Sequence, residues 1–286
     1  MENAIEVRGL CKNYGSFHLQ NVSFTLPRGS IMGLIGENGA GKSTTIKAIL
    51  NLIHRDGGEI SVLGMDCARN ERDIKERVGV VLDESTFHDM LTAREVDKIL
   101  SKIYRNWDHQ LFIKYLDRFS LPENKSIKAY SKGMKMKLSI AAALSVQPEL
   151  LILDEATSGL DPVVRNEILD EFLDFIQDER KAVLISSHIT SDLEKVADYV
   201  TYLHRGRVVV SGARDELLES YGRVACSLED LKKIDRKYLV GCRKNRFGCE
   251  ALVNNRREIQ FLLPGLTVDP VTLEDIMVYT VKGDEQ

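Results

Sequence analysis

The chain has 286 residues, of which 43% are hydrophobic and 29% are charged, and its formal net charge at pH 7 is −4. This composition is typical of a globular protein and argues against a disordered, collagenous or disulfide-dense chain. The charge gives no reason to expect a nucleic-acid surface, because such surfaces are usually strongly basic. The length fits two unequal domains.

The cysteines and the apolar runs limit the class of protein further. The five cysteines form an odd set without a closely spaced pair of metal ligands, which favours reduced thiols over a disulfide framework or a zinc site. No segment approaches the roughly 18 apolar residues that span a bilayer, and the first residues lack the pattern of a signal peptide. We therefore expect any membrane role to depend on a partner.

In chain order, alternating apolar residues first predict two strands. Residues 5–7 suggest the first, and residues 21–26 carry apolar side chains at every second position. Residues 30–35 form a short apolar run that ends at Gly36, and a helical pattern follows over residues 42–53. The segment between them is therefore a loop that joins a strand to a helix.

Later segments alternate between short apolar runs and amphipathic helical stretches, which is typical of an α/β core. The apolar runs predict further strands at residues 78–82, 150–153, 182–185 and 200–203. Residues from about 91 to 146 are helical throughout, and we interpret them as a helical insertion. The helices predicted within it are 94–104, 109–119 and 133–146.

The pattern changes again after Tyr221. Strand-like pieces at residues 237–242 and 257–263 precede a stretch at residues 272–281 that fits a helix. We interpret this region as a separate C-terminal module. Its basic residues suit either a regulatory surface or a solvated face, and the solvated face is favoured.

Residues 36–43 read Gly-Glu-Asn-Gly-Ala-Gly-Lys-Ser and fit the pattern G-x-x-x-x-G-K-[ST] of a phosphate-binding loop. Its glycines let backbone N–H groups wrap phosphates, and the N-terminus of the following helix adds a favourable field. We expect Lys42 to reach the β- and γ-phosphates of ATP, and Ser43 to supply a hydroxyl to Mg²⁺. The strand-to-helix setting disfavours the alternative, a chance glycine-rich turn. The ATP-binding residues expected in this loop are Gly36, Asn38, Gly39, Ala40, Gly41, Lys42, Ser43 and Thr44.

A second group of chemically active residues follows the apolar run at 150–153. Asp154 and Glu155 come directly after it, and alternation along a strand predicts that their side chains point to opposite faces. We expect Asp154 to hold Mg²⁺ through its water shell and Glu155 to orient the water that attacks the γ-phosphate. The alternative is a solvated strand end without a catalytic role.

Together with these motifs, the sequence resembles the ATP-binding subunits of ABC transporters, because motifs in the family's order extend over about residues 1–220. Tyr14 stands where the family stacks an aromatic ring on adenine. Asp161, in Ser-Gly-Leu-Asp, matches the loop that crosses to the opposite subunit, and His188, in Ser-Ser-His, matches the switch histidine that contacts the γ-phosphate. Residues 130–134, Tyr-Ser-Lys-Gly-Met, stand at the family's Leu-Ser-Gly-Gly-Gln signature. The residues expected to complete the ATP site of a second subunit are Ser131, Lys132, Gly133 and Met134.

The resemblance implies a fold and an activity. The fold is α/β, a P-loop NTPase ABC cassette with a RecA-like core, an antiparallel β subdomain and a helical subdomain, over residues 1–221. A small α+β module over residues 222–286 follows it, and we hypothesise that this module strengthens dimer contacts. The activity is ATP hydrolysis with ATP and Mg²⁺ as cofactors, and the implied catalytic residues are Lys42, Glu155 and His188.

The resemblance also implies partners and a location. A second ATPase subunit, expected to be a copy of this chain, forms a head-to-tail dimer that closes around two ATP molecules. A separate transmembrane permease receives the free energy, which places the protein at the cytoplasmic face of the cell membrane. No nucleic-acid partner is expected.

Three positions depart from the family's usual pattern. Asp83 stands where the family has the glutamine that senses Mg²⁺, so the implied metal set is Ser43, Asp83 and Asp154. Lys132 and Met134 replace the signature's glycine and glutamine. Lysine-bearing signatures of this kind are similar to those of bacterial exporters of the ABC-2 type, so we expect export, with an amphipathic peptide or antimicrobial compound as the substrate.

Two other functions fit the sequence less well than transport. A soluble ABC ATPase that acts on ribosomes or DNA generally has two cassettes or a long inserted coiled coil, whereas this chain has one cassette and a short helical insertion. A non-catalytic nucleotide sensor is disfavoured because Lys42, Asp154, Glu155 and His188 are all present.

Overall fold

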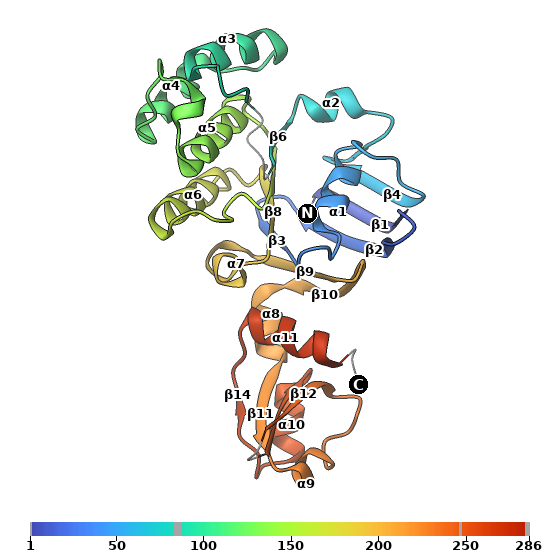
Figure 1. Ribbon diagram of the computed structural model, residues 1–286. Coiled ribbons are helices and arrows are strands. Elements are labelled where there is room, and N and C mark those ends of the chain that lie inside the picture. Colours follow the sequence, from blue (N-terminus) through green and yellow to red (C-terminus); the bar gives the residue numbers. More distant parts are fainter. Residues whose placement is uncertain (1, 83–86, 246–247, 284–286) are drawn as a thin grey trace.

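The computed structural model describes residues 2–82, 87–245 and 248–283. Figure 1 shows a larger upper part, which contains the N-terminus, and a smaller lower part built from the C-terminal strands and helices. None of the helices within these ranges is long and apolar enough to cross a bilayer.

A six-stranded sheet forms the centre of the larger part, in the order β10-β9-β3-β8-β7-β6. Its parallel strands are buried on both faces, which explains why they are continuous apolar runs in the sequence. These predicted strands are confirmed, and β10 adds an antiparallel edge. The strands are β3 (Ile31–Ile35), β6 (Val78–Val81), β7 (Leu150–Asp154), β8 (Ala182–Ser187), β9 (Tyr199–His204) and β10 (Arg207–Ala213).

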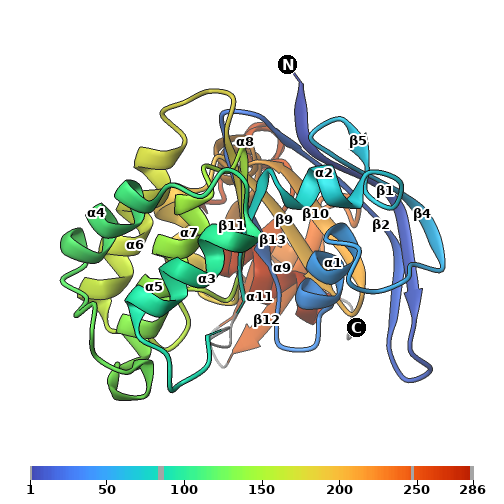
Figure 2. The same ribbon diagram turned by 90° about the horizontal axis from the view of Figure 1, so that it is seen from above.

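An antiparallel sheet of order β2-β1-β4-β5 lies to one side of this core, as Figure 2 shows. Its strands are β1 (Asn3–Asn13), β2 (His18–Pro27), β4 (Gly57–Val62) and β5 (Met65–Asp66), and a short helix, α2 (Glu71–Lys75), follows them. Helix α1 (Lys42–Ile49) shares one apolar core with this sheet. The predicted extension of that helix to residue 53 is wrong, because the chain turns at Asn51, whose φ of 53° is left-handed.

The helical insertion lies on the opposite side of the core (Figures 1 and 2) and consists of α3 (Ala93–Ile103), α4 (His109–Arg118), a 3₁₀ turn (Ile127–Ala129) and α5 (Lys132–Ser145). Side-chain caps define where these helices begin. Thr92 and Glu95 form a capping box at α3, and Asp108 accepts a hydrogen bond from the Leu111 amide at α4. The predicted helices are therefore confirmed. Two more helices, α6 (Pro162–Phe175) and α7 (Thr190–Val196), flank the central sheet.

The smaller part follows α8 (Arg214–Ser220) and contains an antiparallel sheet of order β12-β13-β11-β14. The predicted strand at residues 257–263 is wrong: this segment lies in α10, where the Asn255 side chain accepts a hydrogen bond from the Glu258 amide and only Ile259 is buried. The predicted C-terminal helix is confirmed as α11. The elements are β11 (Gly222–Cys226), α9 (Leu228–Leu231), β12 (Leu239–Asn245), β13 (Gly248–Val253), α10 (Arg256–Leu262), β14 (Val268–Asp269) and α11 (Leu273–Gly283).

Helix α11 connects the smaller part back to the larger one. Its first residue, Leu273, is 4% exposed and belongs to the same apolar core as Ile35 and Val200 of the central sheet. The Leu273 amide donates a hydrogen bond of 2.6 Å to the Glu194 carboxylate on α7. The two parts are therefore joined by buried side chains as well as by the chain itself.

Candidate functional site

The predicted phosphate-binding loop runs from the end of β3 to the start of α1. Gly41 has a φ of 111°, and a Cβ added there would lie 2.5 Å from the Leu19 side chain, so the position requires glycine. The tip of the loop at residues 37–39 is exposed. The Lys42 side chain lies inside the loop, where its ammonium donates hydrogen bonds to the carbonyl oxygens of Gly36, at 2.7 Å, and Glu37, at 3.3 Å.

The structure brings the three predicted catalytic residues into contact. The Lys42 Nζ lies 3.0 Å from the Glu155 Oε1, and the His188 Nδ1 lies 2.7 Å from the Glu155 Oε2. Lys42 begins α1, Glu155 follows β7, and His188 follows β8. These elements meet because the carboxyl ends of neighbouring parallel strands share one edge of the sheet, where ligands of open α/β sheets bind.

The two adjacent carboxylates have different surroundings. Asp154 is 5% exposed at the end of β7, and its Oδ1 accepts a hydrogen bond of 2.5 Å from the Ser186 hydroxyl. Glu155 lies beyond the strand with a φ of 54°, so alternation along a strand does not determine its direction, contrary to our expectation. Its amide donates to the Ser186 Oγ at 3.0 Å. Ser186 thus holds both positions, a role that we missed although it lies in the Ser-Ser-His motif.

The residues near this edge offer oxygen ligands of the kind that Mg²⁺ prefers. Asp154 supplies a buried carboxylate, and Ser43, directly after Lys42, supplies a partly buried hydroxyl. The donor set therefore fits a hard cation that completes its shell with water and phosphate oxygens. Asp83, the third residue of the predicted set, lies outside the described residues.

The signature residues form a separate group at the start of α5. Ser131 caps this helix, with its Oγ accepting a hydrogen bond of 3.2 Å from the Met134 amide. Lys132 reaches the loop before α6, since a Cβ added at Gly159 would lie 2.8 Å from its Nζ. In the part of the chain that the structure describes, these contacts of Ser131 and Lys132 do not involve Lys42, Glu155 or His188.

The remaining predicted residues lie at two other places. Asp161 caps α6, and its Oδ1 accepts hydrogen bonds from the amides of Val163 and Val164. Tyr14 lies in the turn between β1 and β2 with 51% of its surface exposed, and the Lys12 Nζ is 5.2 Å from its ring centroid. The exposed ring is compatible with stacking on a base.

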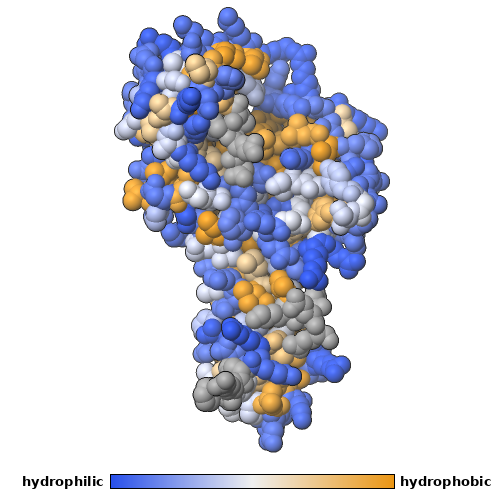
Figure 3. Space-filling view, in the orientation of Figure 1, coloured by the Kyte–Doolittle hydropathy of each residue, from blue (hydrophilic) through white to orange (hydrophobic). Residues whose placement is uncertain are grey.

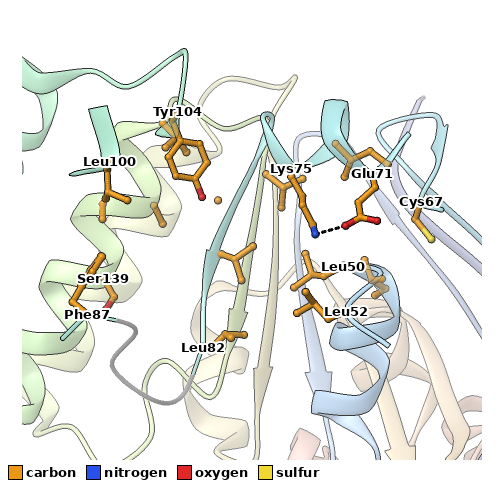
Figure 4. A pocket seen from close by; sticks show the side chains of 18 residues that line it. Leu50, Leu52, Cys67, Glu71, Lys75, Leu82, Phe87, Leu100, Tyr104 and Ser139 are labelled. Carbon is orange, nitrogen blue, oxygen red and sulfur yellow. Dashed lines mark hydrogen bonds and ion pairs between the residues drawn. The ribbon is translucent and has the colours of Figure 1, made fainter. Parts of the chain in front are cut away.

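An apolar cavity of about 380 Å³ lies between α1 and the helical insertion (Figure 4). Leu50 and Leu52 line it from one side, and Leu100 on α3 lines it from the other. Figure 3 shows apolar side chains gathered on this face of the larger part. Leu82 and Phe87, the residues on either side of positions 83–86, also line the cavity. Sequence patterns do not predict this cavity, because its walls come from segments that are distant along the chain.

Comparison with known proteins places this site in a wider context. A family model described as ABC transporter matches residues 19–158. The ABC transporter ATP-binding protein NatA of Bacillus subtilis is 34% identical over 71% of this chain and 84% of its own length. The bacitracin transport ATP-binding protein BcrA of Bacillus licheniformis is 35% identical over 84% of this chain and 74% of its own. A solved structure of an ATP-binding subunit of an ABC transporter superposes with a TM-score of 0.67 at 29% identity, covering 75% of this chain and 91% of that one.

Proposed function

Because this chain belongs to the family of ABC transporter ATP-binding proteins, we propose that it hydrolyses ATP to power a separate transmembrane permease. The observation that carries this proposal is the contact of Lys42, Glu155 and His188 at one edge of the central sheet. A lysine for phosphate, a carboxylate for water and a histidine beside that carboxylate are the groups that hydrolysis of a γ-phosphate requires.

Each residue of the site has a defined task in this proposal. Backbone N–H groups of the loop at residues 36–44 and the N-terminus of α1 bind the phosphates, with Lys42 against the β- and γ-phosphates. Glu155 orients the attacking water, and His188 fixes the Glu155 carboxylate and contacts the γ-phosphate. Tyr14 stacks on adenine. Ser43 and Asp154 would hold Mg²⁺, which would supply positive charge to the phosphate oxygens.

The site is completed by a second copy of the chain. Ser131 and Gly133 at the N-terminus of α5 are placed to bind an anion, and the Lys132 ammonium adds positive charge beside them. In the described part of one chain, the contacts of these residues stay near the starts of α5 and α6 and do not reach Lys42. This separation supports a head-to-tail homodimer in which the signature of each subunit covers the ATP of the other. Met134 and the loop that ends at Asp161 lie at the same interface in this arrangement.

The apolar cavity between α1 and the helical insertion is the docking surface that we assign to the permease. Most of its lining residues are apolar. Two of them, Leu82 and Phe87, are the described residues nearest in sequence to Asp83, the position that the family resemblance links to the permease. This contact would hold the protein at the cytoplasmic face of the membrane. The lysine-bearing signature favours export, and the similarity to a bacitracin transport protein favours an amphipathic peptide or antimicrobial compound as the substrate.

The domain division follows the same proposal. We assign residues 1–221 to the ATPase domain, with the helical subdomain at about 91–146, and residues 222–286 to an accessory module. The separate sheet of β11 to β14 supports the boundary, because it has an apolar core of its own around Val224 and Val253.

Replacement of Glu155 by glutamine tests the proposed chemistry. The variant keeps the size of the side chain but removes the carboxylate, so we expect it to bind ATP, to dimerise and to lose at least about 100-fold in turnover. A Mg²⁺-ATPase assay and sedimentation with ATP measure these properties. Glu59→Gln, an exposed substitution on β4, is the matched control. Wild-type turnover of Glu155→Gln would remove Glu155 from the mechanism.

A further inference from the structure

The turn between β9 and β10 lies against the phosphate-binding loop, and sequence motifs do not mark it. Strand β9 pairs with β3 in parallel, with Ile35 opposite Tyr202. The same register, continued two residues beyond the end of β3, places Glu37 opposite His204. The loop therefore begins alongside the last residues of β9.

Three contacts connect this turn to the loop. A Cβ added at Gly36 would lie 2.5 Å from the Leu203 carbonyl oxygen, so the two backbones are in close contact. The Gly206 amide donates a hydrogen bond of 3.0 Å to the Ala40 carbonyl oxygen. The side-chain contact is between the His204 Nδ1 and the Glu37 Oε1, which are 2.9 Å apart.

The contact between His204 and Glu37 differs from an ordinary surface ion pair. The His204 side chain is 3% exposed, whereas that of Glu37 is 49% exposed, so a buried imidazole lies against a carboxylate from the exposed tip of the loop. The backbone carbonyl of Glu37 in turn accepts a hydrogen bond from Lys42. A continuous path of contacts thus runs from β9 through Glu37 to the lysine of the loop.

We propose that His204 is a positioning residue that holds Glu37, and through it the phosphate-binding loop, in the conformation that receives the nucleotide's phosphates. This inference rests on the proposed ATP binding and adds a residue that the family's motifs do not contain. Because a preformed loop loses less conformational entropy when it binds, removal of the contact weakens ATP binding and leaves the groups that act on the bound γ-phosphate in place.

The test compares His204→Ala, Glu37→Ala and the double variant in the full chain. Each single variant is expected to weaken binding of a fluorescent ATP analogue about three- to tenfold, and to raise KM while kcat changes less than about twofold. The double variant is expected to bind ATP no less tightly than the single variant that binds it less tightly, since both changes remove the same contact. In His204→Gln the side-chain amide can still donate to Glu37, so binding is expected to recover.

The controls separate this inference from the proposed function. Arg207→Ala changes an exposed residue at the start of β10, whose guanidinium donates to the Gln20 side chain, and this variant should bind ATP as the wild type does. Because Glu37 is half exposed, Glu37→Ala keeps the test valid even where His204→Ala does not fold. Unchanged affinity in Glu37→Ala, or losses that multiply in the double variant, would overturn the inference. A wild-type chain that binds no ATP would instead overturn the proposed function.

Discussion

At the scale of single residues, close backbone contacts determine the shape of the phosphate-binding loop. Gly36 lies between the Leu203 carbonyl oxygen and the Ala40 side chain, where a Cβ would meet atoms at 2.5 Å and 2.9 Å. The motif identifies Gly36, but only the structure shows why a larger residue does not fit at this position. The motif explains its glycines by the phosphates, whereas Gly36 is also required by a strand of the same chain.

Gly36→Ala is therefore expected to disturb the loop even without nucleotide. The added methyl group displaces backbone rather than a flexible side chain, which should cost about 1–3 kcal/mol of stability and weaken ATP binding more than tenfold. Denaturant unfolding and nucleotide titration measure the two effects. Gly265→Ala, at a position where an added Cβ meets no atom within 4 Å, is the control. Equal stability of the two variants would contradict this account.

At the scale of elements, a cluster of ion pairs joins the N-terminal ends of the central strands, opposite to the site. Glu149, directly before β7, accepts hydrogen bonds of 2.6 and 2.7 Å from Arg77, directly before β6, and one of 3.0 Å from Arg28. The hydrogen bonds from Arg77, and then the one from Arg28, hold the pKa of Glu149 below its ordinary value. The cluster therefore aligns the strands whose other ends carry the chemistry.

This pKa shift predicts a pH dependence with a definite sign. Because the folded-state pKa of Glu149 is lowered, its stabilising effect is present above the ordinary pKa of 4.5 and is lost as the pH falls through the folded-state value. Glu149→Gln should be less stable than the wild type by about 1 kcal/mol at neutral pH, a value reduced by solvent screening, and the difference should shrink in acid.

Urea unfolding from neutral pH down to acid checks the expected convergence. Glu219→Gln, which breaks an exposed pair with Arg257, should show a difference near zero at every pH. A constant difference between Glu149→Gln and the wild type would show that the carboxylate's charge is not the cause.

The elements were predictable to different degrees, for physical reasons. Buried parallel strands and well-capped helices are identified by apolar runs and by cap residues such as Thr92 and Asp108. The strand predicted at residues 257–263 is wrong, because its apolar residues do not form one buried face: Ile259 is buried, whereas Phe261 and Leu262 are exposed in α10. An apolar pattern identifies an element only where the same residues also face a core.

At the scale of the whole molecule, α11 makes the stability of the two parts interdependent. Leu273, in the C-terminal part, is buried beside Ile35 and Val200 of the central sheet, and its amide is bonded to Glu194 on the helix after His188. The C-terminal part therefore covers apolar surface of the larger part. Its removal would expose that surface to water.

Leu273→Ala should destabilise the cooperative unfolding of the larger part as well as of the smaller one. The loss of a buried leucine side chain costs about 2–4 kcal/mol, whereas Leu262→Ala, at a position that is 52% exposed, should cost less than about 0.5 kcal/mol. Thermal unfolding followed by the fluorescence of Trp107, which lies in the helical insertion, reports on the larger part. An unchanged transition at Trp107 would mean that the two parts unfold independently.

The sequence by itself determined the family, the α/β core and the identity of the phosphate loop, because these depend on local patterns and on motif order. It also named Lys42, Glu155 and His188. Only the tertiary structure showed that these three side chains touch, that Ser186 holds two neighbouring positions, and that His204 reaches Glu37. Those contacts join residues that are distant along the chain, and the register of parallel strands, which no local pattern encodes, decides which of them meet.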